Sequence, residues 1–235
     1  MRLVCFSDLH GDARTSGVRR FDEAREAMRQ VFAHALESKA DYVAFLGDLA
    51  DPDGPDAFRI LGELRRMIDW VGDAGVGFVA VSGNHDVLEE GNEPRSILSA
   101  LGHDGVIERP TLTSLCSRGE RLPVLFLPFT PSWAPYDPAE VAKRFVEEHP
   151  TGPALVLGHL NLEGIHPGSE AKEFARGRSV FWPLDVLEPH ALRMVLLGGH
   201  VHKAQRYRGV EVVGSTMRLD HGEEDLVPRF LVVEV

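Results

Sequence analysis

The sequence has few cysteines and no long hydrophobic run. Only Cys5 and Cys116 occur among its 235 residues, so a disulfide-based scaffold is excluded and we expect no redox role. No segment approaches the roughly 20 consecutive apolar residues that a membrane-spanning helix requires. The N-terminus also lacks the long apolar segment of a signal peptide. These absences predict a soluble, cytoplasmic protein without a membrane partner.

Positive charge is scarce as well. The 25 lysines and arginines are outnumbered by 36 aspartates and glutamates, which gives a formal net charge of −11. Such a charge repels nucleic acids and acidic membranes on average. An anionic substrate would therefore need local compensation, either from metal ions or from arginine, which forms forked hydrogen bonds to phosphate.

Apolar runs of strand length recur along the chain, and 43% of the residues are hydrophobic, enough for a sizeable core. The runs lie at 2–6, 42–46, 76–81, 123–127, 154–157 and 194–197. Between the first three runs, residues 19–37 and 56–74 each place apolar side chains on one helical stripe. In the second helix the predicted stripe consists of Phe58, Leu61, Leu64, Ile68 and Val71. The first half therefore predicts the order β-α-β-α-β.

Shorter runs follow at 204–208, 210–214 and 229–235, and their spacing by turn residues predicts antiparallel pairing. Strand-helix alternation followed by hairpins is typical of a layered α/β fold with mixed sheets. No linker, repeat or low-complexity segment divides the sequence, so we expect one domain over residues 1–235.

Polar residues follow the ends of five predicted strands. The sequences are Asp8-x-His10, Gly47-Asp48, Gly83-Asn84-His85-Asp86, Gly158-His159 and Gly199-His200-x-His202. Because the carboxyl ends of strands in an open α/β sheet converge on one crevice, we expect these side chains to meet there. A single Asp-x-His pair is more typical of a surface turn, but five such elements in succession favour a common site.

The chemistry of these side chains favours divalent metals. Two carboxylates, one amide and four histidines form a mixed oxygen and nitrogen set that suits Mn²⁺, Fe²⁺ or Zn²⁺. The set comprises Asp8, His10, Asp48, Asn84, His159, His200 and His202. It exceeds the needs of one ion and suffices for two ions about 3.5–4 Å apart that share a bridging carboxylate, an arrangement that activates water for attack on a phosphoryl group. Two cations would also reverse the local field of an acidic protein.

These motifs, together with Asp51 in Gly47-Asp48-x-x-Asp51, resemble those of the calcineurin-like metallophosphoesterases over residues 7 to 202. The resemblance implies a four-layer αββα sandwich that carries a two-metal site. It also implies the distribution of the ligands: one metal is held by Asp8, His10 and His202, the other by Asn84, His159 and His200, and Asp48 bridges the two.

The same resemblance implies that His85 is the general acid and that Asp51 orients it. Elementary chemistry agrees, because nearby dications disfavour the imidazolium form of a histidine whereas an adjacent carboxylate favours it. For Asp51 an alternative is a cap of the turn before Pro52.

Within this family the chain most resembles the SbcD/Mre11-type DNA repair nucleases. Residues 213–223 are similar to their GSxxRxxFGE stretch, although His221 replaces the usual aromatic residue, and 198–206 are similar as well. The resemblance implies a DNA nuclease, with Mn²⁺ as the preferred metal, in which a metal-bridging hydroxide attacks phosphorus and His85 protonates the leaving sugar oxygen. Predicted substrate contacts are Arg14, Arg178, Lys203 and Arg218.

Such nucleases are often dimers and act with an SbcC/Rad50-like ATPase, so the resemblance also implies these partners. The capping domain and the ATPase-docking helices of full-length members are not evident in residues 1–235. Two other functions stay open from the residues: a phosphatase or small-molecule phosphodiesterase of the same family, and a non-catalytic scaffold.

Overall fold

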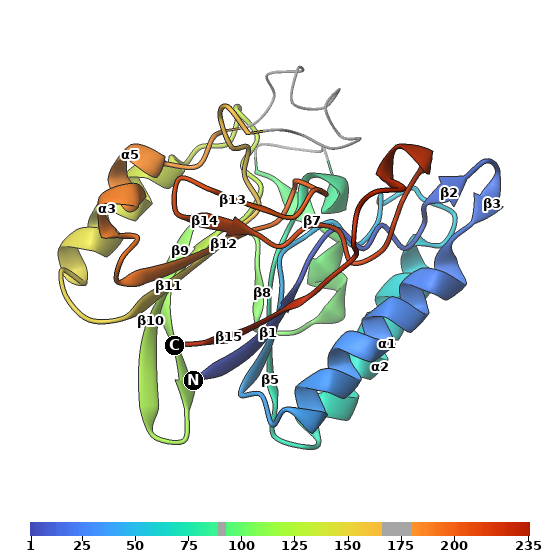
Figure 1. Ribbon diagram of the computed structural model, residues 1–235, viewed down its shortest axis with the longest axis horizontal. Coiled ribbons are helices and arrows are strands. Elements are labelled where there is room, and N and C mark those ends of the chain that lie inside the picture. The colour runs from blue at the N-terminus through green and yellow to red at the C-terminus, as the bar shows by residue number, and fades with distance from the viewer. Residues whose placement is uncertain (89–92, 166–179) are drawn as a thin grey trace.

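The computed structural model describes residues 1–88, 93–165 and 180–235. Two mixed β-sheets lie face to face in the middle of the molecule, with helices on both outer faces (Figure 1). Helices α1 (Phe21–Glu37) and α2 (Ala57–Gly72) cover one sheet, and α3 (Pro138–Glu148) and α5 (Leu184–Leu187) cover the other. This arrangement is the predicted four-layer αββα sandwich.

The first sheet is built by the N-terminal half of the chain together with the last strand. Its order is β15 (Leu231–Glu234), β1 (Arg2–Phe6), β4 (Tyr42–Phe45), β5 (Gly77–Val81) and β8 (Val106–Ile107). Neighbouring strands are parallel except for β15, which runs antiparallel to β1. The predicted β-α-β-α-β order is confirmed, and the final run returns to the first strand rather than extending the preceding hairpin.

The second sheet contains six strands. Their order is β13 (Gln205–Tyr207), β14 (Val210–Val212), β12 (Met194–Gly198), β11 (Ala154–Gly158), β10 (Glu120–Leu127) and β9 (Thr111–Ser117). The central strands β10, β11, β12 and β14 are parallel, whereas β9 and β13 are antiparallel edges. Among the described residues, two short antiparallel strand pairs stand outside the sheets: β2 (Arg14–Thr15) with β3 (Val18–Arg19), and β6 (Val87–Leu88) with β7 (Arg95–Ser96).

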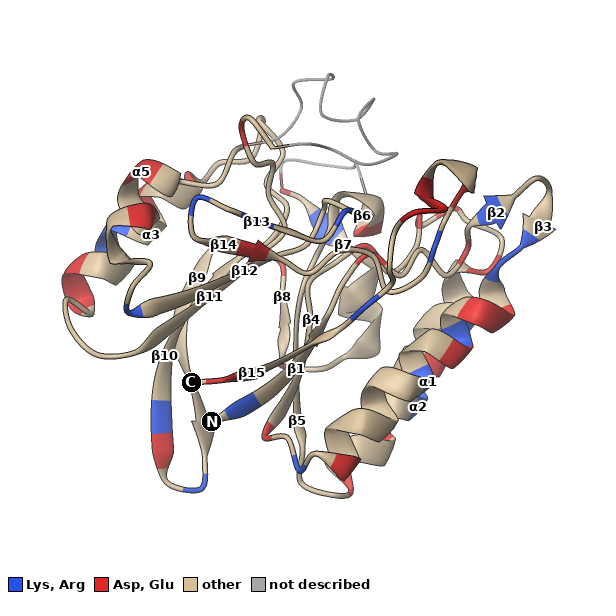
Figure 2. Ribbon diagram, in the orientation of Figure 1, with Lys and Arg blue, Asp and Glu red and all other residues tan. Residues whose placement is uncertain are grey.

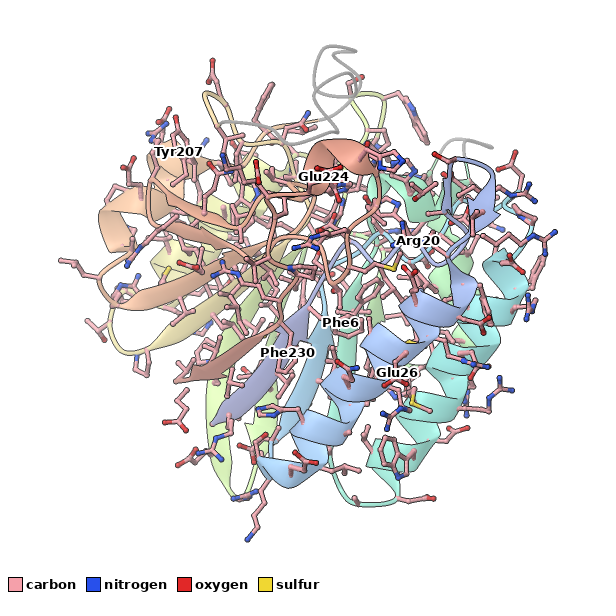
Figure 3. All side chains as sticks on the ribbon, turned by 45° about the vertical axis from the view of Figure 1, so that its right-hand side comes forward. Phe6, Arg20, Glu26, Tyr207, Glu224 and Phe230 are labelled. Atoms are coloured by element: carbon pink, nitrogen blue, oxygen red, sulfur yellow. The ribbon has the colours of Figure 1, made fainter. Side chains whose placement is uncertain are left out.

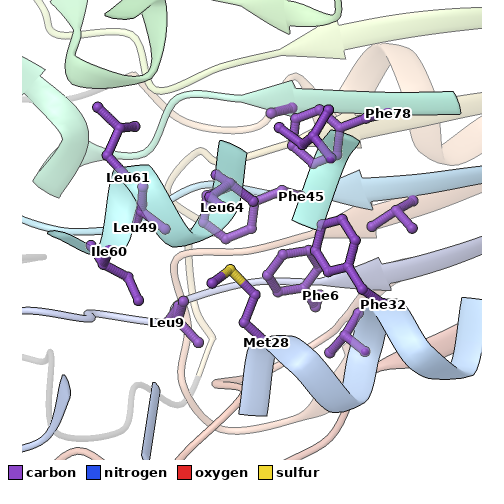
Figure 4. Close-up of a cluster of buried hydrophobic side chains, with 14 of the residues drawn as sticks. Phe6, Leu9, Met28, Phe32, Phe45, Leu49, Ile60, Leu61, Leu64 and Phe78 are labelled. Carbon is purple, nitrogen blue, oxygen red and sulfur yellow. The ribbon is translucent and has the colours of Figure 1, made fainter. Parts of the chain in front are cut away.

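Three hydrophobic clusters hold the four layers together. Figure 4 shows the outer cluster, in which Phe32 of α1 and Leu64 of α2 pack on Phe6 and Phe45 of the first sheet. The rings of Phe6 and Phe45 have their centroids 4.7 Å apart. Burial of each such side chain contributes about 1.5–3 kcal/mol. A second cluster fills the space between the sheets, and a third lies beneath α3 and α5.

The prediction for one residue of the α2 stripe was wrong. Phe58 is 79% exposed, while the buried stripe consists of Ala57, Ile60, Leu61, Leu64, Ile68 and Val71. Phe58 follows Ala57 by one residue, and consecutive residues of a helix point about 100° apart. Its side chain therefore turns away from the sheet.

Charged residues cover the outward face of the helices (Figure 2). On α1, Arg29 pairs with Glu26 at 2.7 Å, a spacing of three residues that places both on the same side of the helix. Within the part of the chain that the structure describes, no helix has the length and apolar character needed to cross a membrane.

Candidate active site

The carboxyl ends of strands from both sheets meet at one edge of the sandwich. Their loops are joined by backbone hydrogen bonds: Asp8 N donates to Gly47 O at 2.9 Å, and His10 N donates to Asp48 O at 3.0 Å. The two sheets are also connected, because Thr216 N donates to Ser7 O at 3.1 Å. All seven residues of the predicted ligand set lie at this edge.

Several of these residues have a left-handed backbone, which is costly for residues other than glycine. The φ angles are 51° at Asp8, 45° at His10, 63° at Asp48 and 78° at His200. Such conformations cost about 1–3 kcal/mol each and concentrate at functional sites. Gly47, with φ 93°, faces a second constraint, since a Cβ there would approach Gly83 N and His159 Nδ1 to 2.6 Å. The strand ends are therefore shaped for close approach of the polar side chains.

Asp8, His10 and His202 form a first group whose potential ligand atoms all lie within 4.8 Å of one another. Two atoms of this group, Asp8 Oδ2 and His10 Nε2, are buried and have no hydrogen-bond partner among the residues that the structure describes. An unpaired buried polar atom is unfavourable unless an ion or another group satisfies it. A cation in the first group would satisfy both atoms.

Asp48, His159 and His200 form a second group with the same spacing limit of 4.8 Å. Asn84 belongs beside it, because its Oδ1 lies 3.1 Å from His159 Nε2 and 2.8 Å from His200 Nδ1. Asp48 stands between the groups, with Oδ2 3.3 Å from His159 Nε2 and 3.6 Å from His10 Nε2. This position suits a carboxylate shared by two cations.

In three of the histidines, the ring nitrogen that points away from the metal groups contacts a hydrogen-bond acceptor. His159 Nδ1 donates to Leu46 O at 2.5 Å, and His200 Nε2 donates to Asn161 Oδ1 at 2.5 Å. His202 Nδ1 donates to Glu223 Oε1 at 2.7 Å. These bonds fix the ring orientation, so that in the neutral rings His159 Nε2, His200 Nδ1 and His202 Nε2 carry the lone pair that a cation could bind.

The electrostatics of the second group favour positive charge. Burial opposes protonation of His159, but the adjacent Asp48 carboxylate raises the pKa of this histidine to about 9. Burial also opposes ionisation of Asp48, yet His159 and His85 hold its pKa well below the usual value. In the first group, burial raises the pKa of Asp8 to about 6. A bound dication would favour the ionised carboxylates and take the place of the proton on His159.

His85 and Asp51 lie beside these groups and contact each other. His85 Nδ1 is 2.8 Å from Asp51 Oδ1, and His85 N donates to Asp48 Oδ1 at 2.9 Å. The His85 side chain is 24% exposed, so it lies at the surface of the site, whereas His159 is fully buried. This geometry suits a proton donor that meets a substrate.

Asp86 has a structural part in the site that the sequence did not reveal. The side chain is fully buried and accepts backbone N–H groups from Asp48 at 2.9 Å, Leu49 at 2.7 Å and Gly83 at 2.8 Å. Burial raises its pKa to about 7. Asp86 thereby ties the loop after β4 to the 3₁₀ turn Asn84–Asp86 after β5.

Substitution Asp86→Ala is expected to destabilise the metal-free protein by about 2–4 kcal/mol, because several buried N–H groups lose their acceptor. For a chain of this size this corresponds to a decrease in Tm of about 5–15 °C, measured by calorimetry in a chelating buffer. Substitution of the exposed Asp104 by alanine serves as the control, with an expected change within about 0.5 kcal/mol. Equal melting of both variants would contradict the role of Asp86.

The pocket over the two groups has an acidic rim. Besides His10, Asp48, His85, His200 and His202, it is lined by Asp12, Ala13, Asp51, Leu219 and Asp220. Among the described residues that line it, none is a lysine or an arginine.

Three of the four predicted substrate contacts are described by the structure, and none of these three is among the residues that line the pocket. Arg14 and Lys203 are exposed residues outside it, and Arg218 Nε donates to Leu226 O at 2.8 Å. Arg178 lies outside the described residues. A role of these four residues in binding a longer substrate stays a prediction.

The sequence model of the calcineurin-like phosphoesterases matches residues 1–204. The chain belongs to this family. It is thus a metal-dependent phosphoesterase, and the seven clustered side chains suit divalent metals. The segment that contributes Leu219, Asp220 and Glu223 to the site follows the matched residues.

Known proteins resemble this phosphoesterase in sequence and in fold. The DNA double-strand break repair protein Mre11 of Haloferax volcanii is 31% identical over 112 residues, which are 44% of this chain and 24% of that protein. A dimetal phosphatase from Danio rerio shares the fold with a TM-score of 0.55 and 13% identity, over 92% of this chain and 87% of that one. The protein TT1561 of Thermus thermophilus does so with a TM-score of 0.54 and 16% identity, over 91% and 89%.

Proposed function

We propose that this phosphoesterase is a two-metal phosphodiesterase that cleaves DNA, with Mn²⁺ as the preferred cation. The observation that carries the two-metal part is the position of Asp48, whose Oδ2 lies within 3.6 Å of histidines from both groups. The partial identity with an archaeal Mre11 protein and the similar tail sequence support DNA as the substrate.

The two groups of side chains divide the ligands. Asp8, His10 and His202 would hold one cation, Asn84, His159 and His200 would hold the other, and Asp48 would contact both. When bound, two divalent cations supply Lewis-acid activation of water and neutralise the charge of the phosphoryl oxygens.

His85 supplies the proton for the leaving group. The ionised Asp51 can only accept a hydrogen bond, so it holds the proton on His85 Nδ1 and directs Nε2 away from itself. From the imidazolium form, Nε2 donates its proton to the departing sugar oxygen as the P–O bond breaks. A water oxygen forms the new bond to phosphorus and releases one proton to the solvent, so the products are a phosphomonoester and an alcohol.

A substrate panel tests the proposal. With Mn²⁺ present, we expect cleavage of double-stranded or single-stranded DNA, loss of cleavage on addition of a chelator, and recovery on addition of excess Mn²⁺. His85→Ala, prepared in parallel, identifies cleavage by contaminating nucleases, and His149→Ala at the C-terminal end of α3 is the matched control. Hydrolysis of a small phosphodiester without cleavage of DNA would contradict the nuclease assignment.

A small phosphodiester is the second candidate substrate, and the acidic rim favours it. Asp12, Asp51 and Asp220 line the pocket, where they would repel the neighbouring phosphates of a polynucleotide. A substrate with a single phosphoryl group would place its charge at the cations and avoid this repulsion. In the same panel, a kcat/KM for a small diester that exceeds the value for DNA would support this candidate.

A further inference from the structure

In His202 the ring nitrogen that points away from the metal groups, Nδ1, contacts a carboxylate. The acceptor at His159 is a backbone carbonyl and the acceptor at His200 is an amide, whereas Glu223 is acidic and fully buried. Burial of a carboxylate is unfavourable unless its oxygens are well paired. Glu223 meets this condition, since Oε1 lies 2.7 Å from His202 Nδ1 and Oε2 accepts Leu219 N at 2.6 Å.

Glu223 belongs to the tail loop, which we define as residues 215–226. This loop follows the residues that match the family model and is attached to the N-terminal half of the chain. Thr216 Oγ1 donates to Ser7 O at 2.6 Å, and Thr15 Oγ1 of the β2–β3 hairpin donates to Leu219 O at 2.5 Å. Figure 1 shows the tail loop beside this hairpin. The loop is thus held against the loop after β1, which carries Asp8 and His10.

The tail loop also forms part of the pocket wall, through Leu219 and Asp220. Because one oxygen of Glu223 contacts His202 and the other contacts Leu219 N, a single carboxylate joins the first group of ligands to this wall. Asp220, which follows Leu219, accepts a hydrogen bond from Gly222 N at 2.6 Å. This bond closes the turn that carries Glu223.

We propose that Glu223 is a positioning residue that directs His202 Nε2 toward the first metal group and strengthens it as a ligand. A carboxylate that accepts the Nδ1 proton fixes the tautomer and increases the electron density of the imidazole. The inference rests on the two-metal part of the proposed function and is independent of the substrate. It differs from a purely structural role of Glu223, for which any acceptor of the same shape would suffice.

Glu223→Gln tests this role, because it removes the negative charge and leaves a single acceptor oxygen for the two donors, His202 Nδ1 and Leu219 N. In a calorimetric titration of metal-free protein with Mn²⁺, we expect the affinity of one of the two sites to fall about 10–100-fold and the other to stay unchanged. At the Mn²⁺ concentration that fills both sites of the unsubstituted protein, the electron paramagnetic resonance spectrum should change from that of a coupled ion pair to that of isolated ions. Glu224→Gln is the control: Glu224, labelled in Figure 3, is exposed and next in sequence.

The outcomes distinguish the inference from the proposed function. If the unsubstituted protein and Glu223→Gln both bind two Mn²⁺ ions with equal affinity, the inference is overturned and the two-metal function stands. If the unsubstituted protein binds no Mn²⁺, both are overturned. A selective loss at one site in Glu223→Gln, with normal binding in Glu224→Gln, supports the inference.

A measurement on the unsubstituted protein covers the case in which Glu223→Gln does not fold. The ¹⁵N resonances of His202, assigned by their absence in His202→Ala, report which ring nitrogen carries the proton. We expect the Nδ1–H tautomer in the metal-free protein at neutral pH, as the contact with Glu223 requires. The Nε2–H tautomer would overturn the inference.

Discussion

Replacement of His85 by alanine is expected to lower kcat for DNA about 10²–10⁴-fold, the usual contribution of a general acid. Both Mn²⁺ ions should stay bound, because His85 contacts Asp51 at 2.8 Å and acts in this mechanism as a proton donor rather than a ligand. Steady-state kinetics together with metal analysis of the same preparation measure the two effects.

The leaving group gives a sharper test of the same substitution. A nitrophenolate leaves without protonation, so His85→Ala should reduce hydrolysis of a nitrophenyl phosphodiester much less than cleavage of DNA. Asp51→Asn should reduce the DNA reaction by a smaller factor than His85→Ala, since it removes the negative charge beside His85 Nδ1 but leaves an acceptor oxygen and the imidazole. Equal losses for both leaving groups, or the loss of one metal ion, would contradict the role of His85.

Asp48→Asn is expected to have the largest effect on metal content. The charged oxygen of Asp48 lies between the two groups, 3.6 Å from His10 Nε2 and 3.3 Å from His159 Nε2, so its removal weakens both sites at once. Because metal ions contribute several kcal/mol to such reactions and each 1.4 kcal/mol is about a factor of ten, kcat/KM should fall by at least about 10³-fold.

The matched control for Asp48→Asn is Asp53→Asn, an exposed residue of the same loop. Metal content is measured by mass spectrometry after dialysis against Mn²⁺ at a fixed concentration. If Asp48→Asn retains two tightly bound ions, Asp48 does not bridge them.

The sequence allowed the strand ends to be predicted because each carries its own local signal. An apolar run followed by glycine and a polar residue marks the end of a buried strand, as at Gly47-Asp48 and Gly158-His159. The rule that carboxyl ends of strands meet at one edge was then enough to bring these residues together. Their roles as ligands stay predictions until metal is measured.

The residues that hydrogen-bond to the predicted ligand histidines could not be predicted, because these bonds join loops that are distant in the sequence. Asn161 contacts His200, which is 39 residues away in the sequence, and Glu223 contacts His202, which is 21 residues away. Neither residue stands in a local pattern that indicates such a contact. Glu223 was visible within the tail that resembles nucleases, yet only the folded loop shows which side chain it contacts.

Helix α3 also escaped prediction, although a signal for it was present. Asp137 caps the helix by accepting Ala139 N at 2.8 Å, and Pro138 occupies the first turn, a sequence typical of a helix start. Only Ala142 and Phe145 bury apolar side chains after this start, so the hydrophobic stripe is short. Capping residues were more informative here than periodicity.

The two-metal site is tested most directly by a crystal structure of the protein grown with Mn²⁺, with data collected at the manganese absorption edge. We expect two anomalous peaks about 3.5–4 Å apart. One peak should lie among Asp8, His10 and His202, the other among Asn84, His159 and His200, and both should contact Asp48. A single peak, or two peaks that do not share Asp48, would contradict the two-metal site.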